Sequence, residues 1–133
     1  MKIEAIEGIG PAFAKKLRAI GVRSTEELLK RGAAKKDRAG LAEKTGITET
    51  LILEWVNLAD LMRIKGIGEQ YSDLLEEAGV DTVKELRNRR ADNLHAAIVE
   101  ANAKKNLVRR PPALKSVENW IKQAKELPPV VKY

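Results

Sequence analysis

The chain lacks several residue types on which catalytic and metal sites depend. Its 133 residues include no cysteine and a single histidine, His95. The absence of cysteine excludes disulfides and thiolate metal sites. Aromatic residues make up only 4% of the chain, and they are Phe13, Trp55, Tyr71, Trp120 and Tyr133. So few aromatic rings give little support to stacking on single-stranded bases.

Long apolar runs are also missing. No stretch approaches the roughly 20 apolar residues that a membrane-spanning helix needs. The first residues carry Glu4 and Glu7 where a secretory signal would have its apolar segment. We therefore expect no membrane partner and a cytoplasmic location.

The acidic side chains form no catalytic pattern. A metal-dependent nuclease needs several carboxylates that converge on a metal ion, whereas the carboxylates here are spread at the spacing of helical ion pairs. The chain also lacks a phosphate-binding P-loop and a Ser/His/Asp arrangement. We expect a protein without enzymatic activity, catalytic residues, metal or cofactor.

Positive charge predominates, and it is unevenly distributed. The net charge is +6, and the pI is about 9.6. Residues 15–38 hold nine Lys or Arg against three acids, and residues 84–110 hold eight against three. Residues 39–83 between them hold nine acids against three bases. This pattern favours a polyanionic partner, although charge of this size also serves solubility alone.

The sequence contains an internal duplication. A shift of 58 positions pairs Ile6, Gly8, Gly10 and Leu17 with Ile64, Gly66, Gly68 and Leu75. Trp55 and Trp120 correspond at a shift of 65, so the second copy carries about seven extra residues, which we place around 102–112. We expect modules over 1–62 and 63–127, followed by a loose tail over 128–133.

Helix signals recur in both copies, and no strand pattern competes with them. Capping boxes pair Ser24 with Glu27 and Thr82 with Glu85. A long apolar helix is predicted from about Glu49 to Met62, with a counterpart near the C-terminus. The predicted fold is all-α, with two modules of short helices packed through the long central helix.

The two glycine turns carry a resemblance. The pattern formed by Ile6, Gly8, Ile9, Gly10, Ala14 and Leu17 resembles the helix-hairpin-helix motif of DNA-repair enzymes, ligases and polymerases. The resemblance implies that main-chain N–H groups of the turn bind the DNA backbone without reading its sequence. The phosphate-binding residues that it implies in this chain are Gly8, Ile9, Gly10, Ala12, Lys15 and Lys16.

The second turn departs from that pattern, because Glu69, Asp73, Glu76 and Glu77 follow it. Acids near the turn repel phosphate, so we interpret the second turn as mainly structural, with Lys65 as its one favourable contact. Secondary contacts to DNA are expected from two further basic groups, which comprise Arg87, Arg89, Arg90, Lys104, Lys105, Arg109 and Arg110.

Over nearly its whole length the chain also resembles a family of tandem helix-hairpin-helix proteins of unknown function. The resemblance is close over residues 53–66, which read LEWVNLADLMRIKG. Two hypotheses follow. The chain is a monomeric module that binds double-stranded DNA without sequence preference, or it is an adaptor for an acidic protein partner, in which the glycine turns serve only packing.

Overall fold

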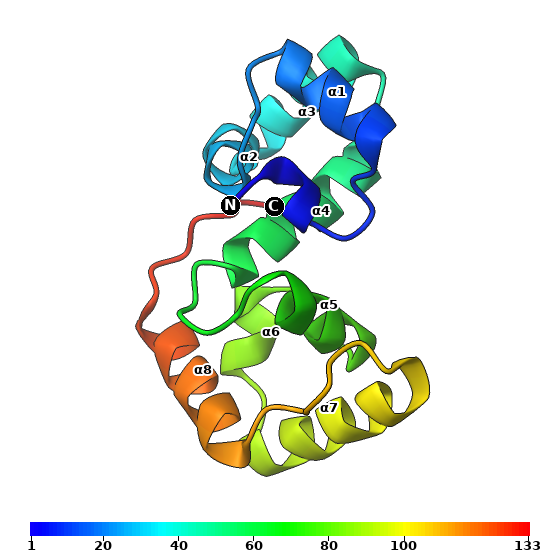
Figure 1. The fold of residues 1–133 in the computed structure, drawn as a ribbon. Coiled ribbons are helices and arrows are strands. Elements are labelled where there is room, and N and C mark those ends of the chain that lie inside the picture. Colours follow the sequence, from blue (N-terminus) through cyan, green and yellow to red (C-terminus); the bar gives the residue numbers. More distant parts are fainter. The chain divides into compact units, whose positions relative to one another are not determined.

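The computed structural model describes all 133 residues and confirms the all-α prediction (Figure 1). The chain forms eight α-helices and one short 3-10 helix. Its one β-type pairing is an isolated bridge between Lys2 and Ser24. None of the helices combines the length and the apolar character that crossing a membrane requires.

The chain divides into two compact units. The first unit comprises residues 1–60 and 129–133, and the second unit comprises residues 61–128. That each is an independent module, with limits at 62 and 127, stays a prediction. The first unit contains η1 (Ile3–Ala5), α1 (Pro11–Ala19), α2 (Thr25–Gly32), α3 (Lys35–Thr45) and α4 (Glu49–Leu61), which runs to the boundary. The second contains α5 (Glu69–Glu77), α6 (Val83–Arg87), α7 (Ala91–Lys105) and α8 (Leu114–Glu126).

The first unit is closed by the N-terminal residues, which lie against α1 and α2. The side chains of Ile3, Ile6, Leu17 and Leu28 are almost completely buried in this core. Helix α1 ends at Ala19 with Ile20 as its C-cap, and Gly21, which follows, has a φ of +88°. Its amide donates to the carbonyl of Arg18. Glycine suits this place after the helix end because it adopts positive φ without steric cost.

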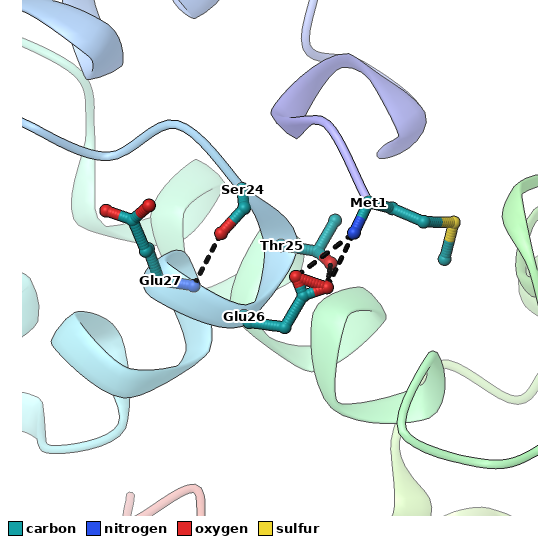
Figure 2. Close-up of polar contacts among 5 residues, drawn as sticks. All are labelled: Met1, Ser24, Thr25, Glu26 and Glu27. Atoms are coloured by element: carbon teal, nitrogen blue, oxygen red, sulfur yellow. Dashed lines mark hydrogen bonds and ion pairs between the residues drawn. The ribbon is translucent and has the colours of Figure 1, made fainter.

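Figure 2 shows how the start of α2 is fixed. The Ser24 hydroxyl accepts a hydrogen bond from the Glu27 amide at 3.1 Å, as the capping box predicts. The Met1 amino group donates to both carboxylate oxygens of Glu26, at 2.6 and 3.0 Å. This hydrogen bond with the ammonium group lowers the pKa of the Glu26 carboxyl. The contact between Met1 and Glu26 joins the start of the chain to α2.

The C-terminal residues, which the sequence predicts as a loose tail, are instead bonded into the first unit. Arg38 is only 4% exposed, and its guanidinium donates to the carbonyls of Ala33 and Lys132. The Lys132 amide donates to the Ala33 carbonyl at 2.8 Å. The Tyr133 hydroxyl donates to Asn57 Oδ1. The tail is ordered because a guanidinium offers several donors that can serve two chain segments at once.

In the second unit, α8 packs against α6 and α7, and α5 packs against α7. The inserted segment after α7 runs back along that helix. Asn102, which is 8% exposed, accepts from the Val108 amide and donates to the Val108 carbonyl, both at 3.0 Å. His95 Nε2 lies 3.0 Å from the Pro112 carbonyl, which can only accept. The insert is therefore fastened at two points.

Candidate functional site

The first glycine turn alternates anchored and exposed residues. Ile6 and Ile9 are 1% and 4% exposed, and the Ile9 amide donates to the Ile6 carbonyl at 3.1 Å. Gly8 and Gly10 are exposed between and beyond them. The isoleucine side chains fix the turn to the core, so that its glycine backbone faces solvent.

Gly8 is required by the fold. Its φ is +95°, and a Cβ at this position would lie 3.1 Å from Nε1 of Trp55. Trp55 is buried and contacts the ring of Phe13, with 5.2 Å between ring centroids. Trp55 is thus a core residue, and its indole lies behind the turn.

Gly10 has no such requirement. Its φ of −84° is open to any residue, and a Cβ there would meet no atom of the chain within 4 Å. As the N-cap of α1 it supplies no capping side chain, although Ser, Asp or Asn stabilises that position better. The amides of Gly10, Ala12 and Phe13 consequently donate to no group of the chain. The start of α1 presents open hydrogen-bond donors beside bare backbone.

Two lysines follow on the same side of α1. Lys15 and Lys16 are exposed, and they lie one helical turn beyond Ala12, about 5–6 Å along the axis. Arg18 is not available in the same way, because it pairs with Glu4. The hydrogen bond from Arg18 lowers the pKa of the Glu4 carboxyl. Glu7 is the exposed acid that remains in the turn without an ion pair.

The second turn repeats the backbone of the first. Gly66 has a φ of +98°, and a Cβ there would lie 2.9 Å from Nε1 of Trp120. The ring centroids of Trp120 and Tyr71 are 5.3 Å apart. A Cβ on Gly68 would again meet nothing within 4 Å. The duplication seen in the sequence therefore extends to the tryptophan behind each turn.

Two features separate the second turn from the first. Gln123 of α8 accepts from the Lys65 amide at 2.9 Å and donates to the Lys65 carbonyl at 3.0 Å. Leu58 holds the corresponding place in the first unit and cannot make these bonds. The helix after the second turn also exposes Glu69, Glu76 and Glu77. In the second turn, therefore, Gln123 occupies the main-chain amide and carbonyl of Lys65, and acidic side chains lie close by.

The other predicted basic residues lie in separate places on the second unit. Arg87 and Arg89 are half-buried near the start of α7, and Arg90 pairs there with Asp92 at 3.0 Å. Lys104 and Lys105 lie at the far end of this 15-residue helix, about 20 Å away. Arg109 and Arg110 are exposed on the insert between its two fastened points. The structure does not gather these cations into one cluster.

Sequence reasoning missed the residues that support each turn. Trp55 and Trp120 correspond to each other in the sequence, but their contact with the glycines follows only from the structure. The Gln123 contact joins residues 58 positions apart and has no local signal. Arg31, counted within a basic block, donates to the Ile20 carbonyl at the end of α1 and so serves the fold.

Comparison with protein families places the chain. The family model described as a domain of unknown function, DUF4332, matches residues 7–127. The match covers most of the sequence, so the chain belongs to this family. Comparisons with curated proteins and with solved structures gave no match.

Proposed function

We propose that the two glycine turns are helix-hairpin-helix motifs, and that the first binds the phosphate backbone of double-stranded DNA without reading its sequence. The protein would act by binding alone, without catalysis. One observation carries the proposal: Gly10 is glycine at a position where the fold requires none. A bare N-cap suits a backbone that a ligand approaches closely.

The chemistry of the first turn suits an anionic oxygen. Amide hydrogens at the start of α1 point along the helix axis, where the helix dipole favours negative charge. Lys15 and Lys16 add two ammonium groups one turn further along. Contacts of this kind reach phosphate oxygens and no base edges, so they position a protein on DNA without selecting a sequence.

The second turn is assigned a structural role. Asp73 occupies the position that corresponds to Lys15, and exposed acids follow on α5. Their charge opposes a phosphate. The basic groups of the second unit would supply secondary contacts: Lys65, Arg87, Arg89, Arg90, Lys104, Lys105, Arg109 and Arg110.

The competing function is a protein-interaction adaptor in which both turns serve packing. The contact between Gly8 and Trp55 favours it, because that contact explains one glycine without any ligand. Glu7 also opposes an anion at the first turn. The two functions differ in what happens when only surface charge is changed.

The test measures fluorescence anisotropy of a labelled random-sequence duplex, titrated with the protein at several salt concentrations. Lys15→Glu with Lys16→Glu is compared with Lys35→Glu and Lys36→Glu, a matched pair of exposed lysines on α3. We expect the first pair to lower affinity at least about tenfold. The slope of log affinity against log salt concentration should also fall by about 2, since one fewer counterion is released for each phosphate contact that is lost. The α3 pair should have a much smaller effect.

A second comparison tests the backbone itself. Gly10→Ala places a methyl group where the phosphate would approach, whereas Gly68→Ala makes the same change in the acidic turn. Of these two substitutions, we expect only Gly10→Ala to weaken DNA binding. Equal effects of the two lysine pairs, or no binding of the wild-type protein at low salt, would favour the adaptor.

A further inference from the structure

The second unit has a groove between the start of α7 and the length of α8, with a volume of about 590 Å³. Leu114, Glu118, Ile121, Lys122 and Lys125 of α8 form one wall. These residues recur at helical spacing, so they line one face of α8 over about 17 Å. The groove is long enough for a short peptide segment.

One large apolar side chain of the groove wall is open to solvent. Leu114 is 40% exposed, which makes it one of the few large apolar side chains on the surface of the protein. Ile121 lies further along the same wall but is buried, at 6% exposed, so Leu114 supplies the open apolar surface. Apolar surface of this kind gains free energy when a partner removes it from water.

Positive charge surrounds this apolar part. Arg89, Arg90, Lys122 and Lys125 line the groove against two acids, Asp92 and Glu118. Arg90 and Asp92 pair with each other at 3.0 Å and so largely neutralise one another. Glu118 then remains against three cations that form no ion pair. The groove carries an excess of positive charge beside exposed leucine.

We propose that this groove docks an acidic, amphipathic segment of a partner protein. An apolar side chain of the segment lies over Leu114, and its carboxylates face Lys122 and Lys125. Complementary charge selects the partner and speeds its encounter with the groove. A phosphate backbone fits less well, because it has no apolar group to place on the leucine. The groove belongs to the second unit and shares no residue with the first glycine turn, so the proposal does not depend on DNA binding there.

The experiment selects peptides on the immobilised full chain from a phage-displayed library of random segments of about 12 residues, enough for a helix to span the groove. We expect enriched peptides to combine several Asp or Glu residues with a large apolar residue. An enriched peptide is then synthesised with a fluorescent label, and its affinity is measured by anisotropy. Lys122→Glu with Lys125→Glu should lower that affinity at least about tenfold.

The matched control is Lys104→Glu with Lys105→Glu, which makes the same change of charge on exposed residues at the end of α7. It should change the affinity less than about twofold, since these residues lie outside the groove. Leu114→Ser should also weaken binding of the peptide. This variant changes no charge, so it tests the apolar contact separately.

Three results would overturn the proposal: no enriched peptides, enriched peptides without acids, or equal effects of the two lysine pairs. A further experiment uses the Lys15→Glu, Lys16→Glu protein, in which the proposed DNA site is removed. If duplex DNA displaces the peptide from that protein, the groove belongs to nucleic acid. If the lysine pair on α1 abolishes only DNA binding and the pair on α8 abolishes only peptide binding, both sites stand separately.

Discussion

The indole nitrogen of Trp55 lies 3.1 Å from the place that a Cβ on Gly8 would occupy. Trp120 stands in the same relation to Gly66, at 2.9 Å. Each unit therefore holds its glycine turn between a buried tryptophan on one side and solvent on the other. The first glycine of each turn serves this contact, and the second leaves backbone uncovered.

This division predicts that Gly8→Ala and Gly10→Ala differ in their effect on the free energy of unfolding. Gly8→Ala forces alanine into positive φ, which costs about 1–2 kcal/mol, and it also presses on the indole. Gly10→Ala replaces an N-cap residue by a poorer one but also restricts the unfolded chain, so the free energy of unfolding should stay within about 0.5 kcal/mol of the wild-type value. Urea unfolding measures both values.

The readout can be confined to one unit. The chain has two tryptophans, one in each unit. In a Trp120→Phe background the fluorescence reports Trp55 and hence the first unit. Gly68→Ala is the matched control for Gly10→Ala. A Gly8→Ala protein as stable as the wild type would show that the indole contact and the positive φ carry no strain.

A second prediction concerns pH and the start of α6. The hydrogen bond with Asp81 raises the pKa of the Glu85 carboxyl. The folded protein thus keeps a proton on Glu85 at pH values where the unfolded chain has lost it. Stability from this group is present at low pH and falls as pH rises through the raised pKa. At neutral pH the two carboxylates repel each other.

Asp81→Asn removes that repulsion and keeps a polar side chain. We expect the free energy of unfolding to rise by about 0.5 kcal/mol near neutral pH, a small value because the pair is largely exposed. At pH values below the raised pKa of Glu85 that carboxyl carries a proton in the folded protein, and the gain should vanish. Glu77→Gln, on an exposed residue of α5, controls for the change in net charge. A gain that persists at low pH would contradict the assignment to Asp81 and Glu85.

A third prediction addresses the insert. Asn102→Ala removes both hydrogen bonds to Val108, which is itself only 7% exposed. Leaving a buried amide and carbonyl without partners should cost about 2–4 kcal/mol. Hydrogen exchange of the Val108 amide should become much faster.

The control for the insert is Asn106→Gly, since Asn106 ends α7 at a φ of +53°, which glycine adopts without strain. This variant should keep the stability of the wild type. Unchanged exchange at Val108 in the Asn102→Ala protein would show that the contact between His95 and Pro112 holds the insert alone.

The features that sequence predicts are those set by near neighbours along the chain. Ser24 and Glu27 are three residues apart, and the capping contact follows from their spacing. The all-α fold and the burial of Trp55 and Trp120 follow from helical periodicity. Gly8 and Gly66 are recognised because glycine alone tolerates their backbone.

The contacts that sequence misses join distant residues. Gln123 and Lys65 are 58 positions apart, and Arg38 and Lys132 are 94 apart. Such pairs are set by how the helices pack, which periodicity does not specify. A buried arginine in particular has no local signal, because Arg38 follows Lys35, Lys36 and Asp37 in a charged stretch that resembles an exposed helix face.

The last prediction tests that buried arginine. Arg38→Met keeps the length of the side chain but removes its hydrogen bonds to the carbonyls of Gly32, Ala33 and Lys132. We expect a loss of about 2–4 kcal/mol, since buried carbonyls lose charged donors. In the Trp120→Phe background this loss should appear in the Trp55 fluorescence.

Exchange of the Lys132 amide, which donates to Ala33, reports the tail directly. It should accelerate in Arg38→Met and stay unchanged in Lys36→Met, which alters an exposed residue two positions earlier. If the Lys132 amide stays protected while stability falls, Arg38 acts through the turn after α2 alone. If both respond together, the guanidinium joins the end of the chain to the first unit, and removing residues 129–133 should destabilise that unit in the same way.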